Sequence, residues 1–233
     1  RMPLISDAVL GASYSPHDGH LNPLLLLRAL HQRMQGLGCD YIPEQRVSAT
    51  RAHGRSFDVT VAHQKYQAKQ LVLCAGLENR RLASDLSMHI PLHPVRGQLL
   101  ISERLDKFMP CASLQLRQTG DGTLQIGDSH EHVGMDESAT LEVITRLAAR
   151  AVRIFPHLTG VQLVRAWGAL RIMTPDGYPI YQQSQRFPGA FSLSCHSGVT
   201  LAALHAGAVA DWICDAREDA EIAEFSAERF DVS

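Results

Sequence analysis

Residues 165–214 read RAWGALRIMTPDGYPIYQQSQRFPGAFSLSCHSGVTLAALHAGAVADWIC, and this stretch decides the fold. Its β-rich run, residues 190–194, passes through the polar turn 195–198 into an apolar, small-residue segment, 199–214, which is long enough for about four helical turns. A strand, a turn and a helix in this order aim free backbone N–H groups and the positive end of a helix dipole at whatever lies over the turn. The stretch therefore predicts a place for an electron-rich or anionic group.

The first half of the same stretch presents an arginine beside a tight turn. Arg171 ends the extended run 168–171, and the turn sequence T-P-D-G follows it at 174–177. A strand-like segment, 178–181, comes next. Two interpretations are open: an arginine that is solvated or paired with Asp176, and an arginine that serves a ligand.

The two halves together resemble a known family. The order G-x-L-R, T-P-D-G-x-P and H-S-G-x-T-L-A, followed by a small-residue helix, is similar to the carboxy-terminal region of the D-amino-acid oxidase (DAO) superfamily of FAD-dependent amine oxidoreductases. The wording is most similar to glycine oxidase, the cyanide-forming glycine dehydrogenases and the D-hydroxyproline dehydrogenases. The resemblance implies an α/β (α+β) fold, in which a Rossmann-like FAD/NAD(P)-binding domain is interleaved with a mostly antiparallel substrate domain.

Composition excludes several other classes of protein. The 233 residues fit one large or two small domains, and a net charge of −2 argues against nucleic acid or anionic membrane as the main partner. The five cysteines are odd in number and contain no C-x-x-C pair, which disfavours a disulfide framework or a zinc site and favours a reducing, cytoplasmic compartment. No apolar run is long enough to span a membrane.

The chain opens with Arg-Met-Pro and contains no G-x-G-x-x-G. In the resembled family that fingerprint binds the dinucleotide on the first strand–helix turn. We therefore expect a longer protein, whose amino-terminal FAD-binding segment is missing from this chain. The resemblance assigns residues 19–83 and 173–233 to the FAD-binding domain, and residues 1–18 and 84–172 to the substrate-binding domain.

Two turns are predicted to contact the cofactor. The apolar strand 69–74 stops at Ala75 and Gly76, where open α/β sheets bind cofactors. The resemblance places this turn against FAD and the backbone of residues 196–201 at the flavin pyrimidine edge. FAD is expected to be non-covalent, because Arg-Ile-Met stands at 171–173, where some relatives attach flavin through cysteine. The implied cofactor-binding residues are Val47, Ala75, Gly76, Arg96, Gly97, Ser197, Gly198, Val199, Thr200 and Leu201.

Three of these residues have structural alternatives. Val47, which the resemblance places near the adenine, is also a natural core valine. Arg96 either assists the pyrimidine ring or braces its strand. Gly97 serves the backbone rather than the chemistry.

The catalytic prediction rests on Arg171, which matches the carboxylate-binding arginine of the resembled family. A planar guanidinium suits a bidentate grip on a carboxylate. His196 and Tyr178 are predicted only as pocket residues, and a structural role for His196 stays open. No metal site is predicted, because the sequence H-E-H at 130–132 is better explained as a solvated loop.

The implied reaction is FAD-dependent oxidation of the C–N bond of a small amino acid, of the glycine, sarcosine, D-amino-acid or D-hydroxyproline type, to an imino acid. An alternative is an FAD module of a multi-subunit or tRNA-modifying oxidoreductase. A non-catalytic flavoprotein fragment is a further one. The partners expected are a small amino-acid substrate and either identical or different subunits.

Periodicity and turn residues predict the remaining elements. Helices are expected at 23–37, capped by Asn22 and with a wide buried face, and at 136–155, capped by Asp136 or Ser138. Hairpins are expected within 57–68 and 111–128. Strands are also expected within 4–15 and 39–47.

Overall fold

The computed structural model describes residues 2–215 and 220–231 of the chain. The chain divides into two compact units: unit 1 comprises the chain up to Leu37 and Val95–Arg171, and unit 2 comprises Gly38–Pro94 and the chain from Ile172 onward. Residues 19–37 and 84–94 thus fall in other units than the sequence predicts. Which unit binds FAD and which binds substrate stays a prediction.

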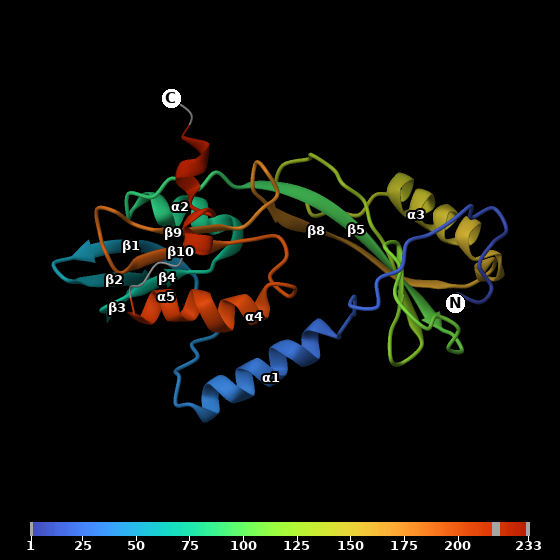
Figure 1. Ribbon diagram of the computed structural model, residues 1–233, viewed down its shortest axis with the longest axis horizontal. Coiled ribbons are helices and arrows are strands. Elements are labelled where there is room, and N and C mark those ends of the chain that lie inside the picture. Colours follow the sequence, from blue (N-terminus) through green and yellow to red (C-terminus); the bar gives the residue numbers. More distant parts are fainter. Residues whose placement is uncertain (1, 216–219, 232–233) are drawn as a thin grey trace. The chain divides into compact units, whose positions relative to one another are not determined.

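Unit 1 is built on a four-stranded sheet with the order β6-β7-β5-β8 (Figure 1). The strands are β5 (His93–Arg104), β6 (Leu116–Gln118), β7 (Thr123–Ile126) and β8 (Leu163–Met173). β7 runs antiparallel to both β5 and β6, which confirms the hairpin predicted within 111–128. The apolar side of the amphipathic helix α3 (Leu141–Ile154), with Leu147 at its centre, packs with Leu100 and Leu124 of the sheet. A 3-10 turn, η2 (Pro156–Leu158), follows α3 and completes this core.

Unit 2 contains two three-stranded sheets. The first is the antiparallel meander β1 (Val47–His53), β2 (Ser56–Val61) and β3 (Gln64–Ala68). The second has the order β4-β10-β9, formed by β4 (Leu71–Leu73), β9 (Ile180–Gln183) and β10 (Ala190–Ser194). β10 is parallel to β4 and antiparallel to β9. The parallel pair is the part of unit 2 that matters for a site, because both its strands end at the same edge of the sheet.

Short helices surround the second sheet of unit 2. They are η1 (Gly76–Glu78), α2 (Asn79–Ser84), α4 (Ala202–Leu204), η3 (His205–Val209), α5 (Ala210–Asp215), α6 (Ala220–Ala223) and η4 (Ala227–Phe230). Trp212 of α5 is buried edge-on against Phe191 of β10, with their ring centroids 5.0 Å apart. Within the described ranges, no helix has both the length and the apolar character needed to cross a lipid bilayer.

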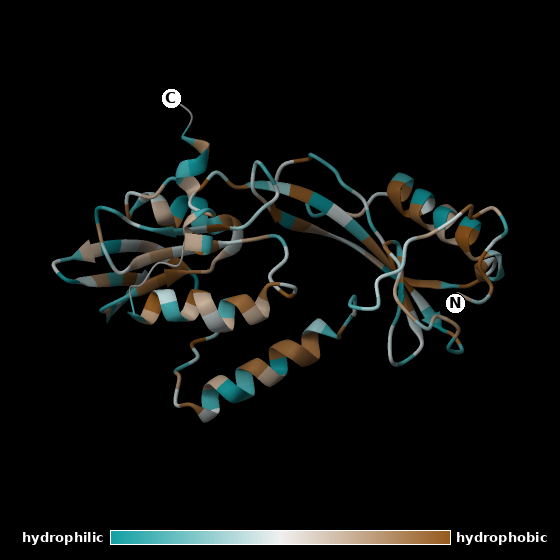
Figure 2. Cartoon of the chain, in the orientation of Figure 1, coloured by the Kyte–Doolittle hydropathy of each residue, from teal (hydrophilic) through white to brown (hydrophobic). Residues whose placement is uncertain are grey.

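Helix α1 (Pro23–Gly36) has the predicted start and lacks the predicted buried face. The side chain of Asn22 accepts a hydrogen bond from the backbone N–H of Leu24 at 3.0 Å, so the cap is confirmed. None of the residues of α1 is buried, and Leu24 and Leu25 are 74% and 62% exposed. Figure 2 shows the resulting apolar stripe along the helix. A periodic pattern predicts the helix, but it does not say which other segment covers the helix.

Three other element predictions are wrong in an instructive way. The helix expected over 199–214 is interrupted, because residues 198–201 form a turn, η3 is a π-helix and Gly207 has the non-helical angles φ −108° and ψ −106°. Helix α3 begins at Leu141 rather than near 136, because Asp136 pairs with an arginine instead of capping. The strands expected within 4–15 and 39–47 are absent from those described segments up to residue 46.

Candidate functional site

Arg171 lies near the end of β8, and its guanidinium rests against the backbone of Gly97 on the neighbouring strand β5. A Cβ at position 97 would lie 2.5 Å from both Cζ and Nη2 of Arg171, closer than any real side chain approaches. The glycine therefore makes room for the arginine. This gives Gly97 a more particular role than the backbone role that the sequence predicts.

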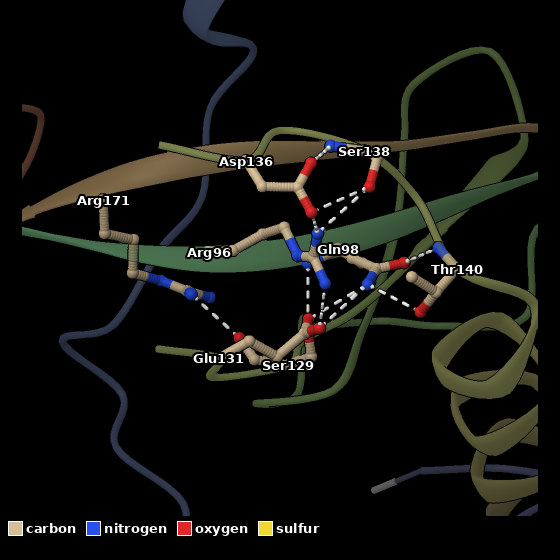
Figure 3. Close-up of polar contacts among 8 residues, drawn as sticks. All are labelled: Arg96, Gln98, Ser129, Glu131, Asp136, Ser138, Thr140 and Arg171. Carbon is tan, nitrogen blue, oxygen red and sulfur yellow. Dashed lines mark hydrogen bonds and ion pairs between the residues drawn. The ribbon is translucent and has the colours of Figure 1, made fainter. Parts of the chain in front are cut away.

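The guanidinium of Arg171 is fixed by two acceptors of one loop. Its Nη1 donates to the carbonyl oxygen of Ser129 at 2.8 Å, and its Nη2 donates to Oδ2 of Asp128 at 3.0 Å (Figure 3). A guanidinium has five N–H groups, and the side chain is 17% exposed, so donors remain for an anion. The predicted alternative of a pair with Asp176 is wrong.

Asp176 pairs instead with Arg229 of η4. Nε of Arg229 lies 2.8 Å from Oδ2 of Asp176, and Nη2 lies 3.1 Å from Oδ1, which makes the pair bidentate. The hydrogen bond from Arg229 lowers the pKa of Asp176. Tyr178 follows in the same turn and is 63% exposed, so its predicted pocket role stays a prediction.

The loop that holds Arg171 is itself anchored by α3. Arg150 donates to the carbonyl oxygens of Gly127 and Asp128, the second at 3.1 Å. Oδ2 of Asp128 also lies 3.0 Å from Nε2 of His130. His130 and Glu131 of the H-E-H sequence are thus engaged with protein partners. Over the described part of the chain, no three His, Cys, Asp or Glu side chains are grouped so as to hold a metal ion.

Arg96 is buried in an ion-pair cluster on the same sheet. Its guanidinium contacts Oε2 of Glu131 at 2.6 Å and Oδ2 of Asp136 at 2.5 Å, and its backbone pairs with that of Glu131. The hydrogen bond from Arg96 lowers the pKa of Glu131. Of the two predicted alternatives for Arg96, the structure displays the one in which it braces its strand.

Residues that the sequence reasoning missed complete this cluster. Glu131 also accepts hydrogen bonds from Oγ of Ser129 at 2.6 Å and from Nε2 of Gln98 at 3.0 Å. Gln98 in turn accepts at 2.8 Å from the backbone N–H of Thr140, the N-cap of α3. The only sequence signal was spacing, because Gln98 follows Arg96 by two residues and so shares its face of β5. The cluster joins β5, the 128–131 loop and the start of α3 (Figure 3).

The second group of predicted residues lies at the carboxyl edge of the parallel pair in unit 2. β4 and β10 are in register from Leu71 opposite Ala190 to Leu73 opposite Ser192. The turn after β4 reaches Gly76, whose φ is +61° and whose Cβ would lie 3.1 Å from Ile172. Both facts keep position 76 free of a side chain.

Asn79 ties the two strand ends together, and no sequence pattern pointed to it. This fully buried side chain donates to the carbonyl oxygens of Leu73 at 3.1 Å and Leu193 at 2.9 Å. Its Oδ1 accepts from the backbone N–H of Ala75 at 2.8 Å. The turn that carries Ala75 and Gly76 is therefore fixed in place before any ligand arrives.

The turn after β10 is open to solvent. Ser197, Gly198, Val199 and Thr200 are exposed, and Leu201 is half-buried. Nδ1 of His196 lies 3.2 Å from Oγ of Ser197. Because the regular helix starts only at Ala202 and α4 spans three residues, the helix dipole predicted at Val199 is not formed.

Val47 lies at the start of β1, where its side chain packs against the core of unit 2. Its carbonyl oxygen accepts a hydrogen bond from Arg81 at 3.2 Å. This placement matches the core alternative for Val47.

The edge of the β4–β10 pair fits a nucleotide cofactor in its local chemistry. Gly76 leaves backbone that only a glycine allows, and the exposed turn 197–200 offers peptide groups rather than long side chains. Bare backbone at the carboxyl ends of parallel strands is where open α/β sheets bind dinucleotides. The Arg171 site of unit 1 offers a positive charge to an anion instead.

Comparison with known proteins gives these sites a family context. The family described as DAO, FAD dependent oxidoreductase, matches residues 1–212. One subunit of the opine oxidase of Rhizobium meliloti is 40% identical over 100% of this chain and 62% of its own length. The opine oxidase subunit of the same name from Agrobacterium tumefaciens is 40% identical over 97% of this chain and 61% of its own length. The chain therefore spans about three fifths of these curated relatives.

Solved structures agree with the fold. Glycine oxidase from Geobacillus kaustophilus superposes with a TM-score of 0.89 at 22% identity, covering 97% of this chain and 63% of that one. L-proline dehydrogenase from P. horikoshii has a TM-score of 0.89 at 18% identity, covering 98% of this chain and 65% of that one. The interleaved α/β architecture predicted from the sequence is thus confirmed.

Proposed function

This chain belongs to the DAO family of FAD-dependent oxidoreductases, and on that premise we propose that the whole protein oxidises the C–N bond of a small amino acid to an imino acid. The observation that carries the proposal is the guanidinium of Arg171, seated on Gly97 with N–H groups to spare. A substrate carboxylate is the anion that such a planar group binds best.

FAD, when bound, supplies the acceptor for the two electrons that leave the C–N bond. In this proposal, the backbone at Ala75 and Gly76 and the turn 197–201 hold the cofactor without a covalent link. These residues contribute peptide groups and exclude bulky side chains. His196 and Tyr178 remain proposed pocket residues.

Arg171 contributes orientation. Ser129 and Asp128 fix one side of its guanidinium, so the remaining N–H groups point in a defined direction. A carboxylate held by them loses its freedom to rotate, and this positioning lowers the barrier to reaction at the adjacent C–N bond.

The test is Arg171→Ala in the full-length protein. We expect the KM for amino-acid substrates to rise roughly a hundredfold, since a desolvated charge-assisted pair contributes about 3 kcal/mol. The visible flavin spectrum of the variant should be unchanged. Arg165→Ala is the matched control, because Arg165 is an exposed arginine on the same strand β8. Equal KM values for wild type and Arg171→Ala would refute the assignment.

The substrate can be identified by anaerobic bleaching of the flavin absorbance. Glycine, sarcosine, D-proline and an opine such as octopine are the compounds to add to the full-length protein. An amino acid or opine that bleaches the flavin supports the proposal, and a flavin that none of a wide panel of amino acids reduces would contradict it.

We also infer that the whole protein works with other subunits. Two relatives at 40% identity are named as subunits of an opine oxidase, which favours the multi-subunit alternative over a single-chain oxidase. Light scattering and affinity purification of the full-length protein from its own cells test this inference. A single-chain species with full activity would overturn it. A cytoplasmic location stays a prediction from the cysteine pattern.

A further inference from the structure

Asp128 places a negative charge directly beside the positive charge of Arg171 within unit 1. Its Oδ2 lies 3.0 Å from Nη2 of Arg171 and 3.0 Å from Nε2 of His130. Its Oδ1 accepts no hydrogen bond from any of the residues that the structure describes. With 36% of the side chain exposed, this second oxygen can be reached by a small molecule.

The carboxylate of Asp128 is held in place rather than free to swing away. Arg150 of α3 binds the backbone carbonyl oxygen of Asp128 itself and that of the preceding Gly127. The next residue, Ser129, is fixed through its Oγ by Gln98 and Glu131. A rigid acceptor next to a rigid donor is the arrangement that recognition of a two-charge ligand requires.

We propose that Asp128 is a specificity-determining residue that binds the cationic amine of the amino acid whose carboxylate Arg171 holds. The inference rests on the proposed function and deepens it. An amino-acid zwitterion carries a carboxylate and an ammonium group on one carbon, and the Arg171–Asp128 pair presents the two complementary charges side by side. Oδ1 accepts the N–H of the ammonium, while Oδ2 keeps its contact with Arg171.

The same carboxylate discriminates against ligands without an amine. A hydroxy acid or a simple carboxylic acid that binds Arg171 brings a negative charge next to Asp128 with no cation between them. The repulsion weakens such ligands relative to amino acids, which is selection by an unfavourable contact with the competitor. Because Asp128 acts on the bound zwitterion, its effect falls on binding and KM rather than on kcat.

The test uses two matched ligands that cannot be oxidised. 2-Aminoisobutyrate and 2-hydroxyisobutyrate share a carboxylate and a carbon skeleton, differ only in the amine, and lack the hydrogen that oxidation of the C–N bond removes. Their dissociation constants are measured on the full-length, FAD-loaded protein by isothermal titration calorimetry. This readout does not depend on turnover.

For Asp128→Asn we expect the Kd of 2-aminoisobutyrate to rise about tenfold, as loss of one charge-assisted hydrogen bond predicts. The Kd of 2-hydroxyisobutyrate should stay the same or fall. Asp121→Asn is the matched control, since Asp121 is an exposed aspartate in the turn between β6 and β7 of the same unit. It should leave both constants unchanged.

Arg171→Ala separates the two ways of failing. If Arg171→Ala weakens both ligands and Asp128→Asn changes both equally or neither, the inference about Asp128 is wrong and the proposed function stands. If wild type binds neither ligand, or if Arg171→Ala leaves both constants unchanged, the proposed carboxylate site is itself wrong.

Discussion

Arg96 and Arg171 lie on neighbouring strands of one sheet, and their surroundings give them opposite uses. The side chain of Arg96 is 4% exposed and contacts two carboxylates, those of Glu131 and Asp136. The side chain of Arg171 is 17% exposed and contacts one carboxylate, which His130 also contacts. The supply of counter-charge, rather than the residue type, decides which arginine is structural and which can bind a ligand.

The physical reason lies in the cost of burying charge. A guanidinium that is taken out of water must be compensated by acceptors within the protein, and Arg96 has two carboxylates and the hydroxyl of Ser138. Little positive potential remains there for an added anion. Arg171 keeps unspent N–H groups and partial access to water, so an anion can replace solvent without the loss of a protein contact.

The largest expected effect of this contrast is on stability. Arg96→Met leaves Glu131 and Asp136 beside each other without their cation, so we expect the melting temperature to fall by roughly 5–10 °C. Arg171→Met should change it by only about 2 °C, because solvent can replace the lost contacts. Thermal unfolding followed by circular dichroism measures both. Similar shifts for the two variants would show that the contrast in counter-charge has no energetic consequence.

A second prediction reverses the order of the two arginines by acting on ligand binding. Gly97→Ala would push the guanidinium of Arg171 from its seat, since the added Cβ would come within 2.5 Å of Cζ. We expect carboxylate ligands of the full-length protein to bind about tenfold more weakly, while the flexible arginine relieves the clash at little cost to stability. Titration calorimetry checks the affinity.

The control for that variant is Gly120→Ala, where a Cβ would meet nothing within 4 Å. It should change neither affinity nor melting temperature. Unchanged carboxylate binding in Gly97→Ala would mean that the position of Arg171 over β5 does not matter to the site.

The contrast also marks how far sequence reasoning reached. The motif around Arg171, the strand 190–194 and the turn after β4 were predicted, because each is a local pattern of neighbouring residues. The counter-ions were not predicted, since Asp128 is separated from Arg171 by 43 positions and Asp136 from Arg96 by 40. Such pairs are created by strand pairing, and no local pattern announces them.

The errors on helices have a related cause. Apolar spacing predicted both α1 and the 199–214 segment, yet α1 has no buried residue and the second segment is broken around Gly207. Periodicity reports that a face is apolar, and it carries no information about the segment that covers the face. Asn79 is the converse case, because a single buried amide with no periodic signal organises the ends of β4 and β10.

The smallest predicted effect concerns pH and sharpens the description of the Arg96 cluster. The hydrogen bond from Arg96 lowers the pKa of Glu131 below its ordinary value of 4.5. A depressed pKa in the folded protein adds stability that is fully present above pH 4.5 and is lost as the pH falls through the folded value. Wild type should therefore lose stability on acidification partly through Glu131.

Glu131→Gln removes that contribution while it keeps a side chain able to accept hydrogen bonds. We expect the melting temperature of this variant to fall by roughly 2 °C less than that of wild type between about pH 5 and about pH 3. The exposed Glu137→Gln in the same loop region is the control and should follow wild type. Parallel pH profiles for wild type and Glu131→Gln would mean that the charge on Glu131 is not linked to folding, and the bracing role of Arg96 would then rest on hydrogen-bond geometry alone.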